Sequence, residues 1–115
     1  MREIAIRGRA VAVAECGKGE PIVYLHGLAD VHGASSRFLP FHERLGARWQ
    51  VLAPAHLGCA GTDEDDSVGS IDDVVFHYLE VLDALKLDRV TLVGSCIGGW
   101  VAAEPDSDRA DTFYF

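Results

Sequence analysis

The sequence predicts an α/β fold in three layers, in which helices cover both faces of a mostly parallel sheet that begins with an antiparallel hairpin. Short apolar runs alternate with segments of helical periodicity along most of the chain. The first two strand-like segments are instead joined by a tight turn at Gly8-Arg9. The length of 115 residues, with 49% hydrophobic and 24% charged residues, fits one ordinary globular domain.

The amino-terminal part of the chain contains three predicted strands. Residues 2–7 alternate charged and apolar side chains, which is typical of a half-exposed strand, and residues 9–15 pair back on them. Residues 22–25 form a continuous apolar run, as in a strand buried on both faces. This run stops at His26-Gly27, which predicts a sharp loop.

A helix, a strand and a loop follow in the middle of the chain. From Ser35 a helix is expected, with Pro40 limiting its start and Gly46 ending it. Residues 49–54 read as another buried strand. The small-residue loop 55–62 comes next, and it leads into an acidic stretch, 63–67, that we expect to be mobile.

The clearest helix begins after Ser70 and runs to about Lys86. Ser70 and Asp73 are placed as N-cap and N3 residues, in a variant of the capping box. Apolar residues recur on one side at helical spacing, and acidic residues lie on the other. The apolar side comprises Ile71, Val74, Val75, Tyr78, Leu82 and Leu85.

Residues 90–93 form the last predicted strand, and a glycine-rich turn follows it. The turn has the pattern Gly-x-nucleophile-x-Gly, which presents a reactive side chain between a strand and a helix. Cys96 has the required glycines, Gly94 and Gly98, whereas Ser95 does not. A dinucleotide-binding fingerprint is excluded because its second glycine would fall on Cys96. A plain strand–helix junction with a buried thiol remains open from this motif alone.

Three loops favour the nucleophile turn over the plain junction. His26-Gly27, the loop around His56 and Cys96 each follow a predicted parallel strand. Because the carboxyl ends of parallel strands meet at one edge of a sheet, these loops should converge where such folds bind ligands.

Over residues 1–104 the chain resembles the amino-terminal half of an α/β-hydrolase-fold enzyme, so the fold is expected to be a truncated form of that architecture. The resemblance rests on the runs 22–27 and 52–58, on the helix start at Ser70 and on the turn 94–99. It implies that Cys96 is the nucleophile and that the backbone N–H groups of Leu28 and Ile97 bind the oxyanion. Residues implied to support the loop and the turn are His26, Gly27, Gly94, Ser95, Gly98 and Gly99.

The resemblance assigns structural roles to the histidines. His26 shapes the oxyanion loop and is not the general base, and His56 supports its own loop in the same way. The three others, His32, His42 and His77, are expected at the surface or in packing contacts.

The chain also departs from the family. Serine is usual at the position of Cys96, although some members use cysteine. The family places an acid and then a histidine after the nucleophile, but no histidine follows Cys96. Residues 105–115 form an acidic tail that is atypical of the family, so we divide the chain into a hydrolase-like part, 1–104, and this tail.

Two functions follow. The first is hydrolysis of an ester-like acyl bond through Cys96, by ancestry, in a chain that is incomplete and weakly active or inactive. The second is a non-catalytic remnant or interaction module. In that case the strand 90–93 would lie at the sheet edge and pair with a second copy or a complementing chain.

Charge and cysteine content restrict the partners. A net charge of −8 argues against nucleic acid and anionic membrane surfaces. The resemblance to the hydrolase family implies a small ester-like substrate, if the chain is active. The three cysteines show no metal-ligand spacing, so neither a metal nor a cofactor is expected. Reduced thiols, and the lack of a secretory or membrane-spanning stretch, predict a cytoplasmic protein.

Overall fold

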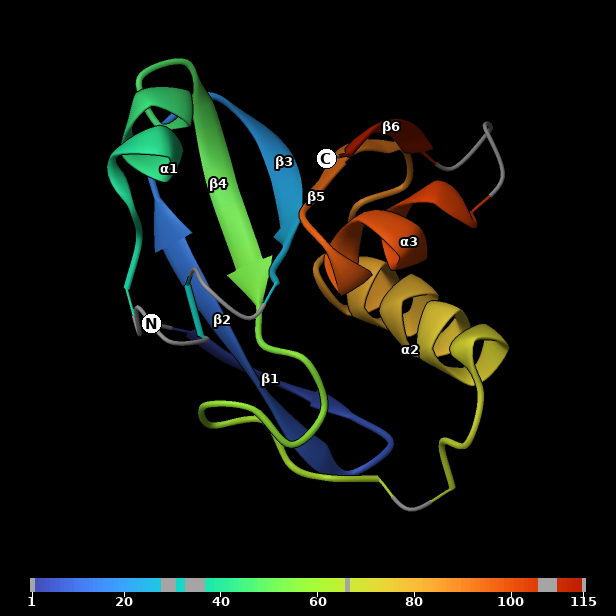
Figure 1. The fold of residues 1–115 in the computed structure, drawn as a ribbon. Helices are drawn as coiled ribbons and strands as arrows, with labels where there is room; N and C mark the ends of the chain where they lie inside the picture. The colour runs from blue at the N-terminus through green and yellow to red at the C-terminus, as the bar shows by residue number, and fades with distance from the viewer. Residues whose placement is uncertain (1, 28–30, 33–36, 66, 106–109, 115) are drawn as a thin grey trace.

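A mixed sheet organises the protein, with helices on both of its faces (Figure 1). The structure, a computed structural model, describes residues 2–27, 31–32, 37–65, 67–105 and 110–114. The strands occur in the order β1-β2-β4-β3-β5-β6 across the sheet. Along the chain the elements are β1 (Arg2–Ile6), β2 (Arg9–Cys16), β3 (Glu20–Leu25), α1 (Pro40–Leu45), β4 (Trp49–Pro54), α2 (Ile71–Ala84), β5 (Val90–Gly94), α3 (Ile97–Ala103) and β6 (Ala110–Tyr114).

The strand directions confirm the predicted fold class. β2 is antiparallel to both β1 and β4, whereas β3 is parallel to β4 and β5. The carboxyl ends of β3, β4 and β5 therefore lie at the same edge of the sheet, and the loops that follow them meet there.

Alternation along the strands divides the core into two layers. In β3, Ile22 and Tyr24 pack on one face together with Leu45 of α1. Val23 and Leu25 pack on the other face, against α2 and α3. Successive side chains of a strand point to opposite faces, so an all-apolar run such as this one is buried on both sides.

Local signals set the helix boundaries. The Ser70 hydroxyl accepts the Asp73 N–H at 3.2 Å, as the capping pattern predicts. α2 ends at Ala84, two residues before the predicted end at Lys86. The helix expected from Ser35 is shorter than predicted, since α1 starts at Pro40. Leu39 is extended, because a residue before proline avoids the helical region; Ser35 itself lies outside the described residues.

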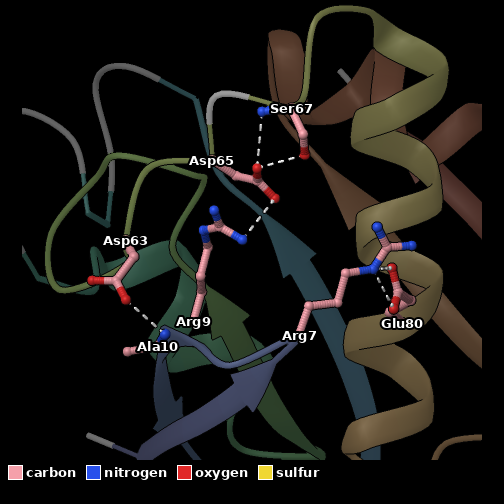
Figure 2. Close-up of polar contacts among 7 residues, drawn as sticks. All are labelled: Arg7, Arg9, Ala10, Asp63, Asp65, Ser67 and Glu80. Carbon is pink, nitrogen blue, oxygen red and sulfur yellow. Dashed lines mark hydrogen bonds and ion pairs between the residues drawn. The ribbon is translucent and has the colours of Figure 1, made fainter.

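The end of the loop after β4 and the first residue of the acidic stretch that follows it are tied back to β2 by hydrogen bonds. Thr62 Oγ1 accepts the N–H of Ala12 at 3.0 Å, and Asp63 Oδ2 accepts that of Ala10 at 2.8 Å. Figure 2 shows the Asp63–Ala10 bond beside two ion pairs. Arg9–Asp65 joins the start of β2 to the acidic stretch, and Arg7–Glu80 joins the turn between β1 and β2 to α2. The side-chain acceptors thus satisfy backbone donors of β2 that β4 leaves unpaired, since the β4 ladder covers only Val13–Cys16.

The predicted edge strand 90–93 is not at the edge, and that expectation was wrong. β6 pairs in parallel with β5 along its whole length, from Val90–Ala110 to Gly94–Tyr114 (Figure 1). No strand is predicted in the tail 105–115, yet β6 lies within it. α3 does end early, at Ala103, as the break at Glu104-Pro105 predicts. The outermost strand on this side is therefore β6.

Among the described residues, no helix combines the length and apolar character needed to cross a bilayer. The longest, α2, has 14 residues, against the roughly 20 that a span requires.

Candidate active site

Cys96 occupies a strained turn between β5 and α3. Its backbone angles are φ 59° and ψ −123°, outside the regions that residues with a side chain normally adopt. The Cys96 carbonyl accepts the N–H of Gly99 at 3.0 Å and of Trp100 at 3.3 Å, so the helix starts immediately. Such a conformation costs about 1–3 kcal/mol and persists only where its surroundings enforce it. The thiol is exposed at the rim of the sheet.

Glycines enforce this turn because no side chain fits beside it. A Cβ on Gly94 would lie 2.4 Å from the Gly98 carbonyl oxygen, and one on Gly98 would lie 2.0 Å from that of Leu25. Gly27 lies under the turn, where a Cβ would be 3.1 Å from the Cβ of Cys96. The backbone of α3 thus packs directly on the ends of β3 and β5.

Ser95 and Gly99 hold the turn through the backbone. The Ser95 N–H donates to the Leu25 carbonyl at 3.1 Å, and the Ser95 carbonyl accepts the Gly98 N–H at 3.0 Å. Gly99 is buried in the first turn of α3. These contacts join the turn to β3 and α3 without using the thiol.

The two backbone donors predicted for an oxyanion differ in what the structure describes. In the described part of the chain, the Ile97 N–H has no hydrogen-bond acceptor and lies directly after Cys96. Leu28 lies outside the described residues. The structure therefore describes only one of the two predicted donors, the N–H of Ile97.

His26 is held by the backbone at both ring nitrogens. Its Nε2 accepts the His56 N–H at 2.9 Å, so its Nδ1 carries the proton and donates to the Gly27 carbonyl at 2.8 Å. Only 2% of its surface is exposed. An imidazole bonded in this way shapes the loop after β3 and is not placed to take a proton from Cys96.

His56 extends this contact to α2. Its Nε2 donates to the His26 carbonyl at 2.7 Å, and its Nδ1 accepts the hydroxyl of Tyr78. The centroids of the two imidazole rings are 3.9 Å apart, and the ring planes are tilted by 36°. Burial raises the pKa of Tyr78 far above its ordinary value, so the hydroxyl remains a donor. Two loops and a helix are thereby joined through these three side chains.

The other histidines form different hydrogen bonds or packing contacts, although the His32 ring lies edge-on to His26 with the centroids 5.4 Å apart. His32 Nε2 bonds to the Ala53 carbonyl at 2.7 Å, and His42 Nδ1 accepts the Leu39 N–H at 3.0 Å. His77 is buried on α2, where burial lowers its pKa. Two of the three histidines expected at the surface or in packing contacts, His42 and His77, are thus buried packing residues.

A pocket of about 620 Å³ lies beside the turn. It is bounded by the loops after β3 and β4 and by the first turns of α2 and α3, and most of its lining is apolar. The lining residues are His26, Gly27, His56, Leu57, Cys59, Glu64, Asp65, Val68, Ile71, Val74, Ile97 and Val101. Its volume lies within the range of small-molecule sites.

Sequence reasoning missed Tyr78 and this pocket. The sequence pattern places Tyr78 only on the apolar face of its helix. A buried tyrosine hydroxyl usually has a hydrogen-bond partner, so the residue type itself is a signal for such a bond. The pocket had no local signal, because its walls come from four separate segments. Among the described residues, no group of three or more potential metal ligands comes together.

Comparisons with known proteins agree with this geometry. The sequence model described as the alpha/beta hydrolase family matches residues 22–114, ten residues beyond the predicted resemblance at its carboxyl end. The chain is 30% identical to a 2-hydroxy-6-oxo-2,4-heptadienoate hydrolase from Pseudomonas putida, over 85% of this chain and 36% of that protein. It is 31% identical to a haloalkane dehalogenase from Agrobacterium fabrum, over 93% and 36% of the respective chains.

A solved structure supports the same likeness. A meta-cleavage product hydrolase from Pseudomonas fluorescens superposes with a TM-score of 0.81 at 27% identity, over 96% of this chain and 42% of that one. The chain spans only 28–36% of the length of the curated relatives that it matches.

Proposed function

This chain belongs to the alpha/beta hydrolase family, and we propose that it carries the nucleophile and oxyanion site of a thiol-dependent acyl hydrolase. Cys96 is the nucleophile, and the N–H groups of Ile97 and Leu28 bind the oxyanion. The relatives named above are hydrolases of different bonds, so their substrates do not transfer to this chain.

The conformation of Cys96 is the observation that carries the proposal. A packing cysteine would be buried in relaxed backbone, whereas this thiol is exposed in a strained turn whose flanking glycines leave no room for side chains. Strain of this kind is maintained where a side chain must be presented. Its neighbours are an unbonded N–H and an apolar pocket, as acyl transfer requires.

The chemistry has two steps. The Cys96 thiolate attacks the acyl carbonyl carbon, the carbonyl oxygen becomes an oxyanion near the Ile97 N–H, and the C–O bond of the ester breaks to release the alcohol. Water then cleaves the S–acyl bond, which regenerates the thiol and releases the acid. Oxyanion donors contribute about 2.7–4 kcal/mol each to the first barrier in known acyl-transfer enzymes.

No histidine of the chain is arranged as a base for Cys96. The His26 ring bonds to the backbone of His56 and of Gly27, and the His56 ring bonds to the backbone carbonyl of His26. The other three, His32, His42 and His77, have the contacts described above. The thiolate, not the thiol, is the reactive form of a cysteine nucleophile. Without a base to activate water, deacylation should limit the reaction.

A burst experiment tests the proposal. An aryl ester such as p-nitrophenyl acetate should release about one equivalent of phenol quickly and then turn over slowly. Cys96→Ala should abolish the burst and the mass increase of one acetyl group. Cys16→Ala is the matched control, because burial raises the pKa of that thiol and Glu43 adds to the shift. A folded protein with no burst, or a burst that survives Cys96→Ala, would overturn the proposal.

We place the reaction in the cytoplasm. Cys16, Cys59 and Cys96 are free thiols, and the proposed nucleophile is exposed, so the activity needs a reducing compartment.

A second candidate function is association through the sheet edge. β6 is the terminal strand on its side of the described sheet, so a second copy or a complementing chain would add to β6 and not to residues 90–93. Gel filtration with light scattering distinguishes the candidates, since a monomer that shows the burst supports the hydrolase alone.

A further inference from the structure

The pocket beside Cys96 has a mostly apolar lining, and the charged side chains among its described lining residues are all negative. Leu57, Val68, Ile71, Val74 and Val101 supply most of its walls, and among the described residues its charged side chains are Glu64 and Asp65. No arginine or lysine of the described chain lines it. A ligand placed there meets apolar surface and carboxylates.

The two carboxylates are not equivalent. Figure 2 shows the Asp65 carboxylate directed at Arg9, with the Ser67 N–H and hydroxyl donating to it at 3.0 and 2.6 Å. The Arg9 guanidinium lies 3.8 Å away. These bonds with Ser67, and then Arg9, lower the pKa of Asp65, so it stays ionised with its charge largely compensated.

Glu64 has no such compensation. In the described residues it forms no ion pair or hydrogen bond, and its side chain folds back over the loop after β4. A Cβ on Gly58 would lie 3.2 Å from Glu64 Cγ and 3.5 Å from Oε1, so the glycine gives the carboxylate room to lie there. Among the described residues, Glu64 therefore contributes an unpaired negative charge to the lining of the pocket.

The His26 imidazole does not offset this charge. Its Nε2 accepts the His56 N–H, so protonation of the ring would place a donor against a donor. The ring nitrogens of His56 bond to the His26 carbonyl and the Tyr78 hydroxyl, and not to Glu64.

Resting on the proposed function at Cys96, we propose that Glu64 is a specificity-determining residue, which makes the pocket select uncharged or cationic apolar acyl groups and reject acyl groups that end in a carboxylate. The apolar walls supply the affinity, and Glu64 supplies the discrimination. A relative named for a heptadienoate, which is itself a carboxylate, would differ from this chain in that preference.

Equilibrium binding to the Cys96→Ala protein tests the selection without any chemistry. The probes are three molecules that share a phenylalkyl group and differ in their charged or polar end: 4-phenylbutanamide, 4-phenylbutylammonium and 4-phenylbutanoate, titrated by calorimetry at low salt. Because Glu64 is exposed, the effect of its charge should be modest, with the carboxylate about two- to fivefold weaker than the ammonium. The difference should shrink at high salt.

Three variants identify the cause. Glu64→Gln should equalise the carboxylate and the ammonium. Glu43→Gln removes the same charge from α1, on the other face of the sheet, and should leave the preference intact. Val68→Trp fills the pocket and should weaken all three probes together, which places them in it.

The inference would be overturned by equal binding of carboxylate and ammonium to the parent, or by a preference that persists in Glu64→Gln. Failure of all three probes to bind the folded protein would also overturn it. Such failure is distinct from failure of the proposed function, because the burst at Cys96 is measured separately with a small acetyl ester.

Discussion

At the scale of single residues, close backbone contacts decide the geometry of the turn. Gly98 is the tightest of them, because the position of its missing side chain is occupied by the Leu25 carbonyl. The turn pattern in the sequence identifies Gly98 correctly, but only the structure shows that its requirement comes from β3 and not from its own backbone angles.

Gly98→Ala should therefore destabilise the fold. The new methyl group would lie 2.0 Å from the Leu25 oxygen, so α3 must shift, at a cost of about 1–3 kcal/mol or more in the free energy of unfolding. Urea denaturation measures this cost. Gly69→Ala is the control, since nothing lies within 4 Å of its Cβ position, and its stability should be unchanged or slightly higher. Equal stability of the two variants would contradict the close contact.

His77 makes the stability depend on pH. Burial is the main cause that lowers its pKa, and Arg7 acts in the same direction, while Glu80 and Asp65 oppose them. The unfolded state thus binds the proton more readily than the folded state. Its neutral form supports the fold fully above the unfolded pKa of about 6.5, and that support is lost as the pH falls below it.

The free energy of unfolding, measured in urea at pH 7.5 and pH 5.5, should therefore fall on acidification. His77→Gln should lose less stability over the same interval, because it cannot take up the proton. If the variant loses as much as the parent, groups other than His77 control the acid response.

At the scale of elements, α2 does more than cover the sheet. Its apolar face packs in the core, and Tyr78 on that face also bonds to His56, which in turn bonds to the loop after β3. The helix thereby positions two of the loops that border the pocket. The periodicity of the sequence predicts the apolar face, but no local pattern shows that one of its residues reaches another loop.

Tyr78→Phe should loosen those loops while keeping the ring in the core. The change leaves His56 Nδ1 without its donor, which should cost about 1–2 kcal/mol of unfolding free energy. A double-mutant cycle with His56→Ala checks the assignment, because two residues that share one bond are not additive. Additive losses would mean that the bond contributes nothing.

At the scale of the whole molecule, β6 is the terminal strand on one side of the described sheet. The strand comes from a short segment near the end of the sequence and covers the full outer edge of β5. Without it, the apolar strand that leads to Cys96 would be open to other chains.

Removal of residues 105–115 should therefore increase association and lower the thermal midpoint. The truncated chain would expose the backbone of Val90–Gly94, which pairs with β6 in the full chain. Light scattering at several concentrations, beside the full chain, measures the effect. A truncated chain that stays as dispersed and as heat-stable as the full chain would show that β6 does not protect this edge.

Local chemistry determined much of this protein from the sequence alone. The strands 22–25 and 49–54, the capped helix after Ser70 and the turn at Cys96 each depend on neighbouring residues, so periodicity, capping and glycine spacing predict them. Their order along the chain was enough to predict a parallel sheet and the family.

Only the tertiary structure decided what depends on residues far apart. β6 is a strand because the outer edge of β5 offers hydrogen bonds to it, and Tyr78 meets His56 because α2 packs beside the loop after β4. The pocket and its charge likewise come from four segments folded together. Such contacts form only when the chain is compact, so no local pattern in the sequence records them.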